Sequence, residues 1–104
     1  MTKTFLISPR TSQLERGGQT YPARRMELRF YWEGALDRTD TSNAFSFCTH
    51  EASQLLAAYD HTSALAFNRN GIFIRITVTA LEKDIEAHRD VLKSNGFKES
   101  KESR

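Results

Sequence analysis

The sequence predicts an α+β domain in which an antiparallel β-sheet of four to five strands carries two helices packed on one face. Residues 25–33 and 72–78 alternate apolar and polar side chains, as strands with one buried face do. Residues 52–59 and 81–92 instead place their apolar side chains at helical spacing. The predicted order is β-β-β-α-β-β-α, which an antiparallel sheet with one-sided helices satisfies.

The first half of the chain is expected to supply three strands. Residues 4–8 form a short strand that ends at Pro9, because proline lacks the N–H that a strand ladder needs. The polar residues 9–24 are expected to form a long loop, and a β-hairpin with an extended tip would also fit them. Residues 25–33 follow as the clearest strand. After a turn-rich stretch, residues 44–48 (AFSFC) alternate again and form the third strand.

The second half is expected to begin with a helix that Thr49 caps, followed by a hairpin. The apolar residues of this helix share one stripe: Ala52, Leu55, Leu56 and Tyr59. Residues 63–67 and 72–78 then form two strands joined at Asn70-Gly71, a dipeptide that favours tight hairpin turns. The alternation places the four apolar residues of 72–78 on one face and Phe73, Arg75 and Thr77 on the other.

The second helix carries signals at both ends. Thr79 and Glu82 have the spacing of a capping box. Gly96 stands where a left-handed cap is needed, and Phe97 can pack on Leu92 in a Schellman arrangement. The buried stripe between them is Leu81, Ile85, His88 and Leu92. Residues 1–97 are therefore expected to form one domain, and residues 98–104 (KESKESR) a disordered charged tail.

Composition narrows the cellular setting. The 104 residues suffice for one core, and 38% are hydrophobic and 27% charged, which is typical of a globular domain. The single cysteine suits a reducing cytosol. The N-terminus lacks the apolar core of a signal peptide, and no apolar run approaches the roughly 20 residues of a membrane span. We therefore expect a cytoplasmic protein without membrane contact, in a cell or in a host cell.

The residues that carry chemistry form no known motif. Cys48, His50 and His61 do not match a zinc-binding spacing, so neither a metal nor another cofactor is expected. A nucleophile pair of Cys48 with either histidine would need an activated thiolate and an orienting third group. His88 lies on an apolar stripe, where a lone histidine is usually a core-boundary residue. The sequence favours a protein that is not an enzyme, with a small thiol-dependent enzyme as one alternative.

The arginines point to binding instead. The net charge is only +2, yet the chain has ten arginines and five lysines, and six of the arginines lie between residues 10 and 38. Arginine binds carboxylates and phosphates through a rigid fork. The helix-free face of the predicted sheet would present arginines beside aromatic rings, and the preceding loop would extend it. The predicted binding residues are Arg29, Tyr31, Phe73, Arg75, Arg24 and Arg25.

Two kinds of partner fit these residues. Tyrosine, phenylalanine and arginine are frequent at the centres of protein interfaces, so a protein or nucleoprotein partner is the leading prediction. The same residues could stack bases and meet phosphates, so an RNA or single-stranded DNA binding domain is an alternative. Glu27 and Glu33 on the same face oppose that alternative. Self-association is a further prediction, through an exposed edge strand such as residues 4–8.

The opening residues 4–10 (TFLISPR) resemble the start of some small phage-encoded anti-CRISPR proteins. The resemblance covers seven residues and carries over no functional residue, because nothing after Arg10 aligns. Proteins of that kind are small α+β or helical domains that block a CRISPR effector by occupying its surfaces. The resemblance thus implies a phage or mobile-element protein that inhibits or modulates a larger nucleoprotein complex.

Overall fold

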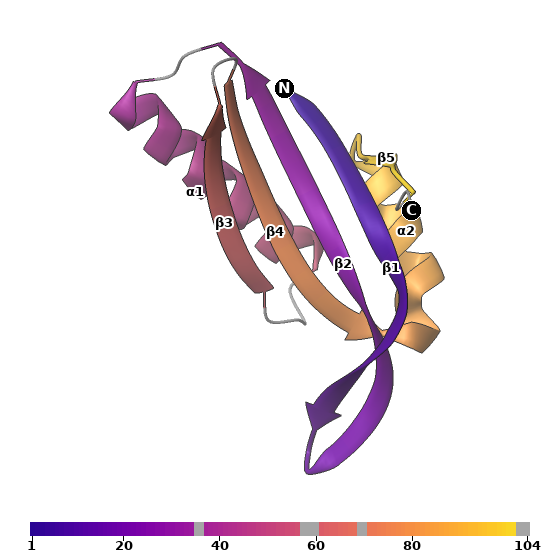
Figure 1. Ribbon diagram of the computed structural model, residues 1–104. Helices are drawn as coiled ribbons and strands as arrows, with labels where there is room; N and C mark the ends of the chain where they lie inside the picture. Colours follow the sequence, from indigo (N-terminus) through magenta and orange to yellow (C-terminus); the bar gives the residue numbers. More distant parts are fainter. Residues whose placement is uncertain (35–36, 57–60, 69–70, 102–104) are drawn as a thin grey trace.

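The computed structural model describes residues 1–34, 37–56, 61–68 and 71–101, and it confirms the α+β class. Five strands form one sheet in the order β3-β4-β2-β1-β5. Figure 1 shows both helices of the described residues behind this sheet, so neither of them covers the face toward the viewer. A 3₁₀ turn at Glu82–Asp84 leads into the second helix. The elements are β1 (Thr2–Arg16), β2 (Gln19–Glu33), α1 (Arg38–Leu55), β3 (His61–Asn68), β4 (Gly71–Leu81), α2 (Ile85–Ser94) and β5 (Lys98–Glu99).

The first two strands are much longer than predicted. Strand β1 continues past Pro9 and pairs with β2 as far as Arg16 opposite Gln19, so residues 9–24 form the hairpin with an extended tip and not a loop. The register shifts between Ile7 and Thr11, and this irregularity accommodates Pro9 without ending the strand. Gly17 and Gly18, with φ of 60° and 78°, make the tight turn at the tip.

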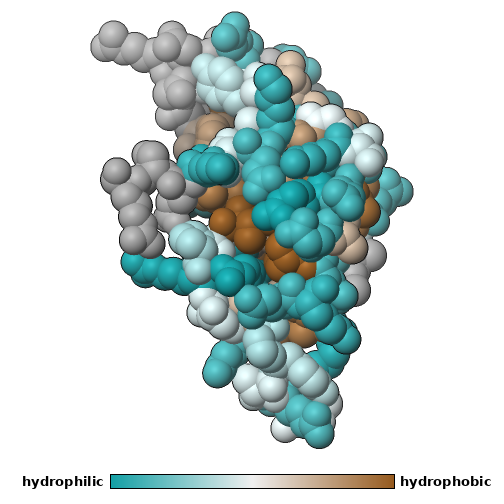
Figure 2. All heavy atoms as spheres, turned by 90° about the vertical axis from the view of Figure 1, so that its right-hand side faces the viewer, coloured by the Kyte–Doolittle hydropathy of each residue, from teal (hydrophilic) through white to brown (hydrophobic). Residues whose placement is uncertain are grey.

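The end of this hairpin projects from the body of the molecule as an arm, at the bottom of Figure 1. We use the term arm for residues 10–22, of which residues 13–22 lie beyond the last pairing of β2 with β4, at Ala23 and Leu81. Figure 2, which views the side of β1, β5 and α2, shows the tip of the arm in white and teal, with the brown apolar side chains confined to the body. The arm therefore adds length and little core.

The predicted third strand is wrong, because residues 44–48 lie within helix α1. The carboxylate of Asp37 accepts the backbone N–H of Asp40 at 2.7 Å, so the N-cap lies twelve residues before the predicted Thr49. The helix buries Thr41, Cys48 and Ala52, which share one face. The Phe-Ser-Phe-Cys alternation is therefore fortuitous. Tyr59, predicted on the same stripe, lies outside the described residues.

The alternation of the other strands is confirmed. The core between the sheet and the helices contains the even-numbered apolar residues of β4 and the alternating residues of β2, together with Phe5 and Leu92. These side chains are fully buried or nearly so. The β3–β4 pairing also forms as predicted, but Gly71 lies opposite Asn68 as the first residue of β4 and not in the turn. Asn70 lies outside the described residues. The set from β2 and β4 is Met26, Leu28, Phe30, Ile72, Ile74, Ile76 and Val78.

The C-terminal cap of α2 is confirmed and its predicted capping box is wrong. The N–H of Phe97 donates to the carbonyl of Leu92 at 3.1 Å and that of Gly96 to Lys93 at 3.2 Å, which is a Schellman motif. Gly96 has the φ of 86° that this motif needs. Thr79 cannot cap the helix because β4 continues to Leu81, and no side chain caps the 3₁₀ turn that follows.

The end of the chain is also more ordered than expected. Residues 98 and 99 form β5, which runs parallel to β1, so the sheet is mixed and not wholly antiparallel. The N–H of Ser100 donates to the carbonyl of Phe5 at 2.7 Å. The predicted domain boundary after residue 97 therefore leaves out a strand, while residues 102–104 lie outside the described part of the chain. Strand β5 pairs with Thr4 and Phe5 and so covers only part of the predicted edge at residues 4–8, whereas β3 is the outermost strand at the other end of the sheet.

Candidate functional site

The helix-free face of the sheet, which we call the open face, is the site that the sequence predicted. It is built from the side chains of β1, β2, β3 and β4 that point away from the helices, and cross-strand pairing sets them in rows. One row places Tyr31 opposite Phe73, and the next places Arg29 opposite Arg75. The small residues Thr2, Thr4, Ala64 and Ala66 flank these pairs at both ends of the rows. The centre of the face is thus aromatic and basic, and small side chains lie on either side of it.

A glutamate lies between the two arginines. Oε1 of Glu27 is 3.0 Å from Nε of Arg29 and 3.6 Å from Nε of Arg75. Two like charges directly opposite each other on neighbouring strands destabilise a sheet, and Glu27 offsets this repulsion. The side chains are 21% exposed for Glu27, 36% for Arg29 and 52% for Arg75. Arg75 therefore has the longer contact and the greater access to a partner.

The aromatic pair is accessible as well. Tyr31 and Phe73 are half-buried against their neighbours, and the strands set both on the face opposite the core. Leu6 belongs to the same face, opposite Glu27, but is only 9% exposed. Ser8, Arg25 and Glu27 line a small hollow of about 150 Å³ beside Leu6. Longer polar side chains thus cover the aliphatic part of the face and leave the rings as its main apolar contact area.

Only one of the two remaining predicted arginines joins the open face. Arg25 is exposed on it, opposite Thr79. Arg24 points to the helix side, where Nη2 is 3.0 Å from Oε1 of Glu82 and Nη1 donates to the carbonyl of Pro9 at 2.7 Å. The Arg24 guanidinium therefore ties the base of the arm to the turn before α2, and the structure does not bring it together with the other five predicted binding residues.

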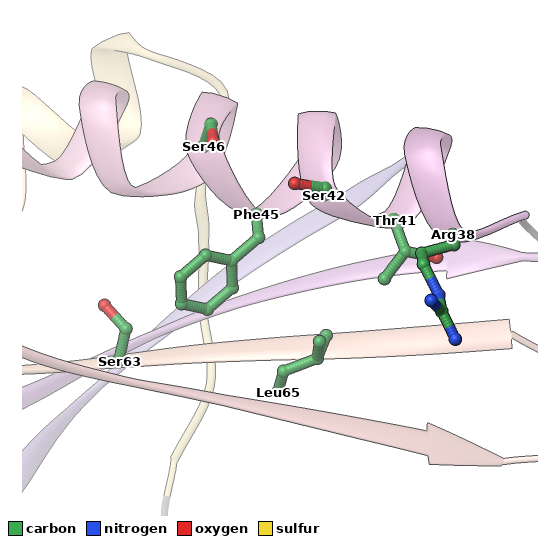
Figure 3. A pocket seen from close by; sticks show the side chains of 7 residues that line it. All are labelled: Arg38, Thr41, Ser42, Phe45, Ser46, Ser63 and Leu65. Carbon is green, nitrogen blue, oxygen red and sulfur yellow. The ribbon is translucent and has the colours of Figure 1, made fainter.

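A second hollow, of about 630 Å³, lies between α1 and β3. Figure 3 shows the ring of Phe45 and the side chain of Thr41 pointing from α1 toward β3, whose Ser63 and Leu65 point back toward the helix. Arg38, Ser42 and Ser46 complete the lining. This hollow was not predicted from the sequence, because the alternation of residues 44–48 indicates a strand and not a helix. A helix beginning at the Asp37 cap would have been the signal that places Arg38 and Phe45 on one side.

The thiol proposed as an alternative nucleophile is poorly suited to that role. Cys48 is fully buried in the core. Burial, with a smaller contribution from the Glu51 carboxylate, raises the pKa of the Cys48 thiol to about 12 despite the opposing effect of Lys3. His50, its nearest histidine in sequence, is exposed, and the side chain of His61 lies outside the described part of the structure. A thiol with this pKa is protonated at neutral pH and is a weak nucleophile.

The described residues show neither a metal centre nor a membrane-spanning helix. They contain no group of three or more His, Cys, Asp or Glu side chains placed to hold a metal ion. Neither described helix has the length and apolar character that crossing a membrane would require. In comparisons with known proteins, no family model, no curated protein and no solved structure matches the chain.

Proposed function

We propose that the protein is a non-enzymatic binding protein that inhibits or modulates a larger protein or nucleoprotein by docking its open face on it. The observation that carries the proposal is the adjacency of the Tyr31–Phe73 row and the Arg29–Arg75 row at the centre of a sheet face without a helix. Aromatic and arginine side chains supply most of the binding energy at protein interfaces, usually from their centres. The flanking small residues allow a partner to approach these four closely.

The charge of the open face indicates an acidic docking surface on the partner. On the open face the three arginines Arg25, Arg29 and Arg75 outnumber the two glutamates Glu27 and Glu33, which leaves a small excess of positive charge. Complementary charge accelerates association and rejects wrong partners more than it adds affinity. The exposed Arg75, held by a contact of 3.6 Å to Glu27, can exchange that contact for a carboxylate or phosphate of the partner.

Steric occupation is the mechanism that such a face supports. A docked domain covers a surface that its partner needs for another contact, and no bond has to be made or broken. The resemblance of residues 4–10 to anti-CRISPR proteins suggests a phage or mobile-element protein and a nucleoprotein complex of bacterial defence in the cytoplasm as the setting. The identity of the partner obtained by affinity capture tests this setting.

Direct binding of RNA or single-stranded DNA is a second candidate. It is favoured by the same rows, since rings on neighbouring strands can stack on bases while arginines meet phosphates. Glu27 and Glu33 make the open face less suited to a polyanion than to a protein. Binding of an oligonucleotide panel that weakens steeply with salt, and that Tyr31→Ala and Phe73→Ala both abolish, would favour this candidate over the protein partner.

The test removes one member of each row. In affinity capture from cells that naturally express the chain, Arg29→Ala combined with Tyr31→Ala should lose a partner that the wild type retains. The Kd of the double variant for this partner should rise at least about 100-fold, since replacing each hot-spot residue costs about 2 kcal/mol or more of binding free energy. The matched control combines Arg10→Ala with Tyr21→Ala, which removes the same residue types from the exposed arm.

Both double variants should remain folded, because none of the four side chains belongs to the core. Circular dichroism and a thermal melt check this before binding is compared. Equal capture by the wild type and the Arg29/Tyr31 variant would eliminate the open face as the docking site. Equal loss in both double variants would show that the total charge, and not this face, determines binding.

A further inference from the structure

Strand β3 leaves one edge of the sheet unprotected. It pairs with β4 alone, and residues 62–66 are exposed. Between residues 62 and 67 (TSALAF) the strand has no charged residue, no proline and no glycine. Proteins usually shield such an edge with charges, proline or a covering element, because its free N–H and C=O groups can pair with another chain. At the other end of the sheet, β5 pairs with Thr4 and Phe5 of β1, and the ladder of β1 with β2 is irregular around Pro9.

The hollow beside this edge is only partly filled from within the domain. Phe45 and Thr41 form its upper side and Leu65 its lower side, as Figure 3 shows. Leu65 is 38% exposed, although it points toward the helix and not toward the open face. In Figure 1, the first turns of α1 lie outside β3, beyond the edge of the sheet. A strand added to β3 would therefore lie under α1 and fill the hollow with every second side chain.

One end of the hollow is basic. Arg38, in the first turn of α1, is exposed and lines the hollow together with Ser42. Within the described part of the chain its guanidinium has no hydrogen bond or ion pair. An arginine in this position can bind a carboxylate through two parallel hydrogen bonds. The apolar middle, the hydroxyl groups along the rim and the basic end define the chemistry of a ligand.

We propose that an extended peptide segment of a partner protein adds to β3 as a sixth strand and occupies this hollow. Its backbone pairs with the free edge of β3, one apolar side chain lies between Phe45 and Leu65, and an acidic side chain or terminal carboxylate binds Arg38. This is recognition by β-strand addition, in which main-chain hydrogen bonds give affinity and alternate side chains give specificity. The site is separate from the open face, so the inference goes beyond the function proposed above.

A peptide fits this site better than a second copy of the chain. Pairing of β3 with itself would fill the apolar part with Leu65 of the second copy. The paired strand itself would offer Arg38 no anion, because residues 61–68 (HTSALAFN) contain no aspartate or glutamate. The volume of about 630 Å³ also falls within the range of roughly 300–1,000 Å³ found for ligand sites.

The experiment compares two fluorescein-labelled octapeptides by fluorescence anisotropy. Both alternate valine and threonine and have an amidated C-terminus, and they differ only in one aspartate or asparagine near that end. We expect the aspartate peptide to bind about tenfold more tightly than the asparagine peptide, as one charge-assisted contact allows. Arg38→Ala should remove this preference, and Leu65→Lys should remove binding of both peptides. Arg10→Ala, a matched loss of one exposed arginine on the arm, should change neither.

Three results of the peptide titrations and of light scattering would overturn the inference. One is the absence of binding to the wild type at about 1 mM of either peptide, the weak limit for a specific contact. Another is an aspartate preference that persists in Arg38→Ala. The third is a wild-type dimer in light scattering that Leu65→Lys makes monomeric, which would assign the edge to a second copy. If Leu65→Lys fails to fold, Ser63→Lys introduces the same charge at the exposed rim.

A fourth measurement separates this inference from the proposed function. The Arg29/Tyr31 double variant should bind the aspartate peptide like the wild type, because its substitutions lie on the other face of the sheet. A parallel loss of peptide binding would place the peptide on the open face and would overturn the β3 site. Failure of partner capture with intact peptide binding would instead count against the proposed function alone.

Discussion

At the scale of single residues, replacing Glu27 on the open face should affect stability and binding in opposite directions. Glu27→Gln should lower the free energy of unfolding by about 0.5–1 kcal/mol, because Arg29 would then face Arg75 without a compensating charge. Urea denaturation measures this, and Glu15→Gln on the exposed arm is the matched control. A stability equal to that of the wild type would mean that repulsion between Arg29 and Arg75 is small even without Glu27.

The same substitution should act in the opposite direction on binding. Without Glu27 the open face gains positive charge, so association with an acidic partner should become faster, and more so at low salt. Stopped-flow or biosensor kinetics with the captured partner would measure the rate. A slower association of Glu27→Gln would contradict the acidic docking surface, whereas Glu15→Gln, remote from the face, should leave the rate nearly unchanged.

Cys48 should be unreactive while the domain is folded. Because burial raises the pKa of its thiol to about 12, the thiolate is scarce even at pH 9, and reagent access is closed as well. Reaction with a disulfide reagent should therefore follow unfolding, slow in buffer and immediate in concentrated urea. Rapid labelling of the native protein, rising through a midpoint near pH 8, would contradict the buried position and would restore the thiol-dependent alternative.

The residues of the open face could be read from the sequence wherever a strand was recognised. The alternation of residues 25–33 and 72–78 correctly places Arg29 and Tyr31 on the face of Arg75 and Phe73. Arg24 was grouped with them because residue 24 had been assigned to a loop, where alternation has no meaning. Once β2 extends through it, Arg24 has the parity of Met26 and points to the helix side.

At the scale of elements, β5 should contribute stability out of proportion to its two residues. A chain ending at Phe97 loses the pairing with β1, the bond from Ser100 to Phe5 and the ion pair between Arg89 Nε and Glu99 Oε1 at 2.9 Å. We expect a loss of about 1–3 kcal/mol in the free energy of unfolding, since several backbone hydrogen bonds and an ion pair disappear together.

The matched control for this truncation is a chain ending at Lys101. It keeps β5 and every contact named above, so its thermal melt should resemble that of the full chain. Equal destabilisation by the two truncations would show that the charge of the tail matters and β5 does not. Equal stability of all three chains would show that β5 is marginal, as a tail disordered from residue 98 would require.

Helix α1 shows where local patterns fail. Its strongest sequence feature, two phenylalanines separated by one residue, has the period of a strand, and serine and threonine throughout it weaken the helical signal. The structure resolves the conflict through packing: Phe45 turns toward β3 while Phe47 stays 53% exposed. The α1–β3 hollow exists only because Phe45 packs toward β3 in the tertiary structure. A pattern within a single segment therefore cannot predict it.

At the scale of the whole molecule, the arm makes the domain longer than its chain length suggests. The radius of gyration is 14.4 Å, against about 13 Å for a compact chain of this size, and the extents are 44 × 29 × 25 Å. The sequence allowed a hairpin for residues 9–24 but did not select it. Proline normally ends a strand, and only a register shift at a particular place lets β1 continue past Pro9.

The arm should open independently of the rest of the sheet. Residues 15–20 pair only with each other across the turn and are exposed, whereas residues 26–31 of the same strand β2 lie between β1 and β4 in the middle of the sheet. Opening the tip breaks no core contact, so its amides should exchange with solvent at least about 100-fold faster than those of the centre. Hydrogen-exchange mass spectrometry compares the two segments within one strand. Equal protection would mean that another surface covers the arm in solution, and the arm would then have to be counted among the docking sites of the protein.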